Sequence, residues 1–147
     1  MAKAFSIEDG NLSNKPITTT KSRTYKDIDC SFEKKLTSGD IYKKTDADAV
    51  KQSVRNLLLT NKGEKPFQPY FGSRLQRLMF SLDMETDESD VEDIVREAIK
   101  NYEPRATVLK VKANFSPDYN SANVTVFLRI RNTMQDVSVT VTIARVR

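Results

Sequence analysis

The last third of the chain alternates apolar and polar residues, and this alternation constrains the fold more than any other feature of the sequence. It occurs in three runs, separated by turn-forming stretches at 116–121 and 132–136. Residues two apart share one face of a β-strand, so each run has a single apolar face. We expect a three-stranded antiparallel meander whose apolar face needs a cover. The apolar positions are Leu109, Val111, Ala113 and Phe115, then Val124, Val126, Leu128 and Ile130, then Val137, Val139, Val141 and Ile143.

Two stretches upstream of this sheet repeat apolar residues with the period of an α-helix and can supply the cover. The first begins at Thr45 or Asp46, either of which can act as N-cap, and stops near Gly63. The second starts within the acidic run 83–93, whose carboxylates suit a helix N-terminus, with Thr86 or Ser89 as cap. The core-facing residues are Val50, Val54, Leu57 and Leu58, then Val91, Ile94, Val95, Ala98 and Ile99, whereas Lys51, Gln52 and Arg55 fall on the solvent side.

These elements predict an α+β fold in which two or three helices pack on a small antiparallel sheet in two layers. The third helix is short, follows Ser73, and has Leu75, Leu78, Met79 and Phe80 as its apolar side. We place the folded domain in residues 45–147. Residues 1–44 are predicted to form an N-terminal arm with a hairpin that turns at Gly39 and Asp40.

A loop rich in proline and aromatic residues follows the first predicted helix. Its prolines restrict the backbone, and its final glycine can take positive φ. The aromatic residues Phe67, Tyr70 and Phe71 are too apolar for a linker, and we expect them to fold back as a lid on the core. The residues that define the loop are Gly63, Pro66, Phe67, Pro69, Phe71 and Gly72.

The segment Glu103-Pro104-Arg105 follows the last predicted helix and carries the strongest functional signal. Pro104 disfavours helical geometry at Glu103, so the helix should end there. A carboxylate at this end opposes the helix dipole, and such breaks of local rules concentrate at functional or strained sites. The two charged side chains can either bind a partner or pair with each other inside the chain, and spacing alone favours the internal pair.

Two motifs, in this order, resemble the family of T4-type phage baseplate wedge proteins, which includes a related baseplate component of type VI secretion systems. The first is an amphipathic helix and then a turn of the form T-x-x-G-x-(R/K)-P-F-x-P-x-F-G, and the second is Glu-Pro-Arg after the last helix. A weaker opening motif, Tyr-x-Asp-Ile-Asp, begins at Tyr25. The turn is matched by Thr60, Gly63, Lys65, Pro66, Phe67, Pro69, Phe71 and Gly72.

The resemblance implies a structural subunit of a contractile tail baseplate. Such a protein docks on the core bundle of the larger wedge subunits through Glu103, Pro104 and Arg105. It gives the first ring of the tail sheath protein a template by β-augmentation, with 137–146 (Val137, Val139, Val141 and Ile143) or 109–115 as the edge strand. The tail tube is a further candidate partner, and six copies are expected in one ring. The protein would be assembled in the host cytoplasm and reside in the tail baseplate of the virion.

Two alternatives accompany this interpretation: a muralytic, lysozyme-like glycosidase of the tail, and a baseplate component of another contractile injection system. A glycosidase needs two carboxylates, one of them with a raised pKa in an apolar pocket. Glu103 beside Arg105 has its ionised form favoured, the chain has no His and no Trp, and Cys30 lacks a His partner. We therefore predict no enzymatic activity and no catalytic residues.

Composition argues against other classes of ligand. Without His or a C-x-x-C pair, we expect no metal site and no cofactor. The longest aliphatic run, 57–59, is too short to cross a membrane. Basic residues beside Phe127 can in principle bind phosphate, but a solvated or protein-docking face is favoured, so we expect no direct nucleic-acid binding. These basic residues are Lys110, Lys112, Arg129 and Arg131.

Overall fold

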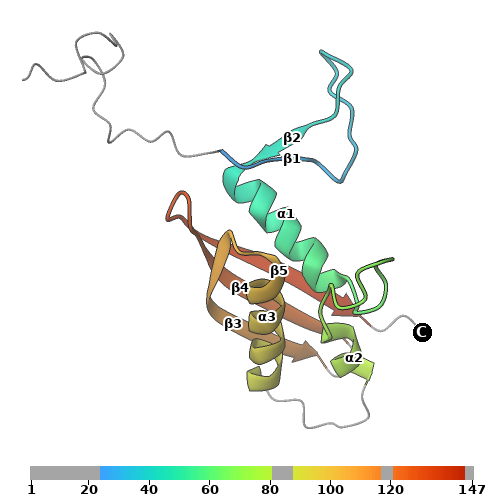
Figure 1. The fold of residues 1–147 in the computed structure, drawn as a ribbon, viewed down its shortest axis with the longest axis vertical. Coiled ribbons are helices and arrows are strands. Elements are labelled where there is room, and N and C mark those ends of the chain that lie inside the picture. Colours follow the sequence, from blue (N-terminus) through green and yellow to red (C-terminus); the bar gives the residue numbers. More distant parts are fainter. Residues whose placement is uncertain (1–23, 81–87, 117–120, 145–147) are drawn as a thin grey trace, which may run out of the picture.

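The computed structural model describes residues 24–80, 88–116 and 121–144. Its centre is an antiparallel sheet in the order β3–β4–β5, formed by Ala106–Ser116, Ser121–Ile130 and Asp136–Ala144. Helices α1 (Asp46–Leu59) and α3 (Glu88–Tyr102) lie on one face of this sheet, and the short helix α2 (Leu75–Phe80) lies beside them (Figure 1). The predicted two-layer α+β fold is confirmed.

The core lies between the helices and the inner face of the sheet. Helix α1 packs on β5 and helix α3 packs on β3, so each helix covers one side of the meander. The expected stripes of α1 and α3 are buried, except that Ile94 is only partly buried. Gln52 was expected in solvent but is buried, because its amide bridges α1 to the N-terminal segment by donating to the Ile28 carbonyl oxygen at 2.7 Å.

A β-bulge in β3 overturns one part of the predicted alternation. Val108 pairs with Leu128 and Lys110 pairs with Phe127, which leaves Leu109 as an extra residue. Leu109 therefore does not point into the core, and it is 42% exposed. Before the bulge Ala106 faces inward, and after it Val111 does, so a change of phase keeps the whole strand amphipathic.

The predicted N-terminal hairpin is present but has very short strands. Strand β1 (Lys26–Ile28) pairs antiparallel with β2 (Lys43–Thr45), and the hairpin projects from the N-terminal end of α1 (Figure 1). Its turn uses Gly39 at φ 71°, whose N–H donates to the Lys35 carbonyl. The boundary between residues 44 and 45 stays a prediction. The hairpin leaves several large apolar side chains exposed, namely Ile28, Phe32, Leu36 and Tyr42.

The proline-rich loop is ordered, as predicted, but only one of its aromatic residues covers the core. Phe71 packs against the core and meets the ring of Tyr102 edge-on at 5.2 Å. Phe67 is fully exposed and Tyr70 is largely exposed, so the expected lid of three rings is wrong. The backbone groups of the loop form hydrogen bonds within the loop, such as that from the Gly63 N–H to the Pro69 carbonyl oxygen at 2.8 Å. This closed shape leaves Phe67 at the tip of the loop.

Other predictions concern the ends of elements. Thr45 stands at the N-cap of α1, although its side chain makes no capping hydrogen bond. Helix α3 begins at Glu88, so Ser89 lies inside the helix and does not cap it. The capping role of Thr86, the carboxylates at 83–87, the side chains of Leu78, Met79 and Phe80, and residues 145–147 lie outside the described part of the chain.

Candidate protein-docking sites

Residues 103–105 form the turn between α3 and β3. The Glu103 N–H still donates to the Ile99 carbonyl oxygen at 2.8 Å, and Pro104 then ends the helix. The Ala106 N–H donates to the Glu103 carbonyl oxygen at 3.2 Å, which closes the turn. Pro104 itself is exposed. The backbone therefore presents Pro104 outward while it directs the Glu103 side chain into the protein.

The Glu103 carboxylate is buried and fully engaged. Arg105 donates from Nε and Nη2 to its two oxygens, both at 2.6 Å, and the Ser53 hydroxyl of α1 donates to Oε2 at 2.5 Å. Glu103 is only 2% exposed. Burial alone raises the pKa of Glu103, but the hydrogen bonds from Arg105 and Ser53 and the charge of Arg105 outweigh burial and lower it below its ordinary value. The internal pair that spacing alone favoured is thus formed.

Arg105 connects this carboxylate to the N-terminal segment. Its guanidinium lies 5.3 Å from the centre of the Tyr25 ring, within the range of a cation–π contact. Tyr25 is held by α1, since its N–H donates to the Asp46 carboxylate at 3.0 Å. We call Glu103, Pro104, Arg105, Ser53 and Tyr25 the corner cluster. The Glu-Pro-Arg motif contained three of these residues and the weaker opening motif began at Tyr25, whereas no local pattern marked Ser53.

The loop 63–72 packs beside the same end of α3. Tyr102 donates its hydroxyl to the Tyr70 carbonyl oxygen at 2.6 Å, and Lys65 Nζ lies 4.3 Å from the centre of the Phe71 ring. Gly72 has φ 114°, and a Cβ atom there would lie 2.5 Å from the Thr60 carbonyl oxygen. Only glycine fits this approach, because the clash is with backbone atoms. The motif residues of this loop therefore have structural roles, apart from the exposed ring of Phe67.

The outward backbone groups of β5 follow from its register with β4. The Ile130 N–H donates to the Gln135 carbonyl oxygen, so this pair exchanges hydrogen bonds, and alternate pairs along an antiparallel ladder do the same. Val137, Val139, Val141 and Ile143 thus direct their backbone groups to β4. The backbone N–H and C=O groups of Ser138, Thr140 and Thr142 point away from the sheet.

The outer edge of β5 carries none of the usual protection against a further strand. It has no Lys, Pro or bulge between Val137 and Ala144. Within the described residues, no side chain is bonded to its outward backbone groups. The edge is therefore free to pair with a further strand.

The outer edge of β3 is closed by helix α3. The Glu88 carboxylate accepts from the Ala113 N–H at 3.2 Å, and Arg96 donates to the Val108 carbonyl oxygen at 3.3 Å. The bulge at Leu109 interrupts the ladder between these two contacts. Of the two predicted edge strands, only β5 offers an uninterrupted row of unbonded backbone groups.

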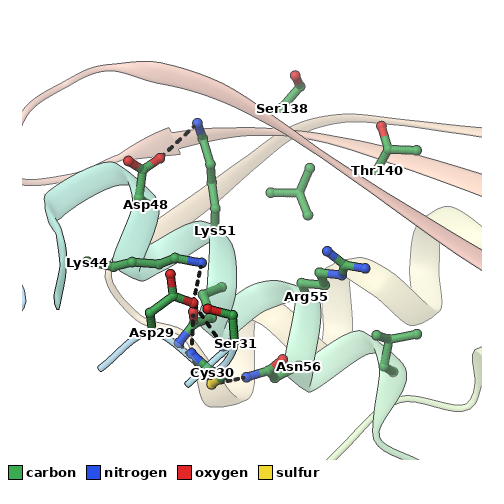
Figure 2. A pocket seen from close by; sticks show the side chains of 13 residues that line it. Asp29, Cys30, Ser31, Lys44, Asp48, Lys51, Arg55, Asn56, Ser138 and Thr140 are labelled. Atoms are coloured by element: carbon green, nitrogen blue, oxygen red, sulfur yellow. Dashed lines mark hydrogen bonds and ion pairs between the residues drawn. The ribbon is translucent and has the colours of Figure 1, made fainter. Parts of the chain in front are cut away.

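A pocket of about 660 Å³ adjoins the edge of β5 and lies between α1 and the hairpin (Figure 2). Lys51, Arg55 and Leu59 line it from α1, and Ser138, Val139 and Thr140 line it from β5. Asp29, Cys30 and Ser31 form its end. The pocket is lined by both polar and apolar residues and is open to solvent.

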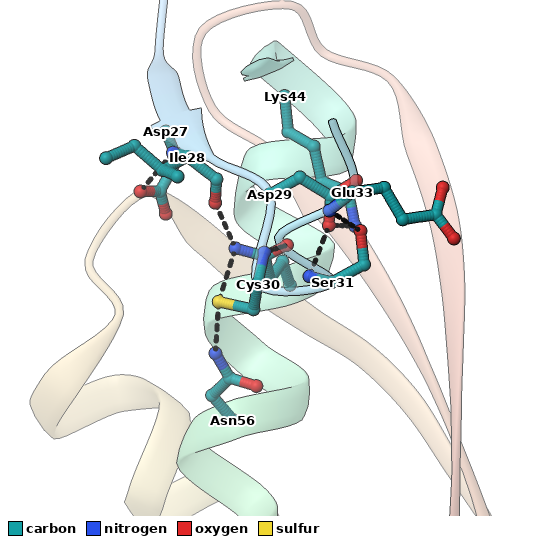
Figure 3. Close-up of polar contacts among 9 residues, drawn as sticks. Asp27, Ile28, Asp29, Cys30, Ser31, Glu33, Lys44 and Asn56 are labelled. Carbon is teal, nitrogen blue, oxygen red and sulfur yellow. Dashed lines mark hydrogen bonds and ion pairs between the residues drawn. The ribbon is translucent and has the colours of Figure 1, made fainter. Parts of the chain in front are cut away.

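Hydrogen bonds around Cys30 fix the hairpin end of this pocket (Figure 3). The Gln52 amide donates to the Cys30 sulfur at 3.0 Å and accepts from the Cys30 N–H at 3.3 Å. Asp29 accepts from the Ser31 N–H at 3.0 Å and pairs with Lys44 at 3.1 Å, and both interactions lower the pKa of Asp29. These contacts anchor the hairpin on α1, so the residues that line this end of the pocket are held in place.

The basic residues considered for nucleic-acid binding lie on the exposed face of the sheet. Arg129 is paired with Asp136 through two bonds of 2.7 and 2.9 Å, and Arg131 donates to Thr107 at 3.3 Å. Lys110 and Lys112 are exposed. Over the described residues, no three His, Cys, Asp or Glu side chains gather as a metal site would require. No described helix is long and apolar enough to span a membrane.

Comparisons with known proteins agree with this fold. A family model described as baseplate wedge protein gp25 matches residues 44–136, which include the corner and the loop. Baseplate wedge protein gp25 of Enterobacteria phage T4 is 29% identical over 108 residues, or 74% of this chain and 80% of the T4 protein.

Two solved structures share the architecture. A candidate tail lysozyme from Geobacter sulfurreducens has a TM-score of 0.58 at 25% identity, covering 67% of this chain and 89% of that one. A chain of the anti-feeding prophage baseplate has a TM-score of 0.56 at 16% identity, covering 82% and 86%, and this likeness concerns the fold alone. The helix-backed meander with its Glu-Pro-Arg turn is thus the fold of a baseplate protein of contractile tail systems. The chain belongs to the baseplate wedge protein gp25 family.

Proposed function

We propose that this protein is a structural wedge subunit that joins a contractile tail baseplate through the corner cluster and offers strand β5 to the tail sheath. The observation that carries the proposal is the difference between the two sheet edges: β3 is closed by α3, and β5 is open. Placement in the tail baseplate of the virion follows from family membership. We also propose six copies in one ring, in keeping with the six-fold symmetry of the anti-feeding prophage baseplate.

Docking through the corner uses the groups that the internal pair leaves accessible. Two bonds from Arg105 reach Glu103, and a guanidinium has five N–H donors, so the described contacts leave donors for a partner carboxylate. Glu103 acts here as a positioning residue, because it is buried and holds the guanidinium in one orientation. Exposed Pro104 adds a rigid apolar contact beside it. The larger wedge subunits are the proposed partners.

Arg105→Gln tests this docking by co-purification of the full chain with the larger wedge subunits. We expect the variant to lose the complex, whereas Arg129→Gln, which breaks the Arg129–Asp136 pair away from the corner, keeps it. Ser53→Ala is the second control, because it weakens the corner cluster without removing the guanidinium. We expect Ser53→Ala to keep the complex, since the guanidinium remains. Retention of the complex by Arg105→Gln would exclude the corner as the docking site.

Sheath templating uses the outward groups of β5. A sheath segment that pairs with Ser138, Thr140 and Thr142 would extend the sheet from three strands to four by β-augmentation. The side chains of these residues are small and uncharged, so they do not obstruct an approaching strand. The tail tube remains a further proposed neighbour of the ring.

Thr140→Pro tests this role, since proline removes an outward N–H that is not needed inside the sheet. We expect baseplates with this variant to assemble but to start no sheath, as judged by electron microscopy. Thr140→Val, which keeps the N–H and the strand shape, should start sheath normally. Normal sheath on Thr140→Pro baseplates would refute the role of β5.

We propose no catalytic role, although one structural neighbour is a candidate tail lysozyme. A glycosidase acid needs a raised pKa, and Arg105 and Ser53 lower the pKa of Glu103. Measurable cleavage of purified peptidoglycan by the full chain, abolished by Glu103→Gln, would contradict this proposal.

A further inference from the structure

The pocket beside β5 gives the open edge a second recognition surface. We call this pocket the groove. Lys51, Arg55 and Leu59 follow one another at four-residue spacing on α1, so they form a single row along it. Ser138 and Thr140 of β5 lie on the opposite side (Figure 2). A segment that pairs with β5 must therefore pass between this row and the strand.

The charges of the groove are not balanced. Lys44 is paired with Asp29 at 3.1 Å, and Lys51 is paired with Asp48 at 3.3 Å. Arg55 is exposed and has no hydrogen bond or ion pair with any described residue. Its guanidinium lies between α1 and the strand that carries Thr140 (Figure 2). The groove thus has one cation whose partner has to come from outside.

Leu59 supplies an apolar position next to this cation. It is half-buried and belongs to the edge of the core, so its remaining exposed surface favours contact with another apolar side chain. Four residues of helix span about 6 Å, and two residues of strand span about 6.6 Å. Alternate side chains of an added strand therefore match the spacing of Arg55 and Leu59.

We propose that the groove selects an extended segment that carries a carboxylate two positions away from an apolar residue, on the side that faces α1. This inference rests on the proposed addition of a strand to β5 and defines the chemistry of that strand. The carboxylate pairs with Arg55, and the apolar residue covers Leu59. Strand pairing supplies affinity, and the α1 row supplies register and choice of partner.

The test uses two labelled peptides of about ten residues that alternate Thr and Val and differ at one central position. One peptide has Glu two residues before a Leu, and the other has Lys in place of the Glu. Binding to the full chain is measured by fluorescence anisotropy, and protection of the Ser138, Thr140 and Thr142 amides is measured by NMR. We expect the Glu peptide to bind about fivefold more tightly than the Lys peptide.

Charge reversal at Arg55 gives the decisive comparison. Arg55→Glu should invert the preference between the two peptides, whereas Lys112→Glu, the same change on exposed β3, should leave it unaltered. Equal binding of both peptides with protected β5 amides would overturn the charge selection and leave strand addition intact. Lack of amide protection with either peptide would overturn strand addition as well.

Discussion

Two Arg–carboxylate pairs in this protein have the same two-bond geometry but different surroundings. Arg105 and Glu103 lie two positions apart in one turn, and the Glu103 side chain is 3% exposed. Arg129 and Asp136 join β4 to β5, and both of their side chains are about half exposed. Burial raises the pKa of both carboxylates and is the largest single influence only for Glu103, yet in each pair the Arg helps to lower the pKa of its carboxylate below the ordinary value.

The comparison shows that hydrogen-bond geometry alone does not decide how much an ion pair contributes to the stability of the fold. Water competes for the Arg129–Asp136 pair, so its loss should cost little. At the corner the Glu103 carboxylate is buried although Arg105 is partly exposed, so removal of Arg105 leaves a carboxylate that water hardly reaches without its main partner. Ser53 and Tyr25 also depend on the corner pair, so it links α1, α3 and the N-terminal segment.

The largest expected effect is that of Glu103→Ala. It leaves Arg105 and the Ser53 hydroxyl without their acceptor, and we expect the free energy of unfolding to fall by about 3 kcal/mol. Urea unfolding followed by circular dichroism measures the change. Asp136→Ala is the matched control and should unfold at nearly the same urea concentration as the unmodified protein. Equal losses in the two variants would remove the distinction between the pairs.

A smaller effect is expected from Glu103→Gln, and it should depend on pH. Glu103 has a folded-state pKa below its ordinary value of 4.5, so its charge stabilises the fold above that value. This contribution is lost as the pH falls through the lowered pKa of the folded state. We expect the unmodified protein to exceed the variant by about 1 to 2 kcal/mol at pH 7 and the gap to narrow towards pH 3. A gap that is constant between these two pH values would show that the charge of Glu103 is not the cause.

Ser53→Ala should cost about 1 kcal/mol, since it removes one hydrogen bond to a carboxylate that keeps two others. Thr107→Ala is a suitable control because its hydroxyl accepts from Arg131 at an exposed site. The difference in unfolding midpoint between the two variants measures how far burial strengthens a single hydroxyl contact. A larger loss for Thr107→Ala would contradict this ranking.

The smallest expected effect is the response of the two pairs to salt. At about 1 M NaCl the Debye length in water is about 3 Å, and the salt weakens exposed ion pairs far more than buried ones. Double-mutant cycles should therefore show that the coupling between Arg129 and Asp136 falls towards zero, whereas that between Glu103 and Arg105 persists. Identical salt dependence would mean that the corner is more hydrated than its burial indicates.

The sequence predicted the fold to the extent that the fold depends on periodic patterns. The inward residues of β4 and β5 and the stripes of α1 and α3 could be read directly, because burial selects apolar side chains at regular spacing. Leu109 could not be assigned correctly, since a bulge depends on how two strands pair and leaves an ordinary apolar residue behind. Gln52 was misplaced because its partner, the backbone of Ile28, is distant in sequence.

The candidate sites, like the fold, could be predicted from the sequence only in part. The corner motif indicated Glu103 and Arg105, and the alternating pattern indicated both edge strands. The choice between β3 and β5 needed the contacts of Glu88 and Arg96 with the backbone of β3, which no pattern encodes. Phe67 and Tyr70 were assigned to the core by their hydrophobicity, but the tight backbone bonds of their loop hold them outside it.

The bulge at Leu109 also limits how β3 can change in length. Leu109 is the extra residue, so its removal would let Val108 and Lys110 follow each other as their partners Leu128 and Phe127 do, and the inward positions on both sides would stay inward. Removal of a single residue far from the bulge would instead turn the inward positions beyond it outward. The strand should therefore tolerate the loss of Leu109 better than the loss of any single residue away from the bulge.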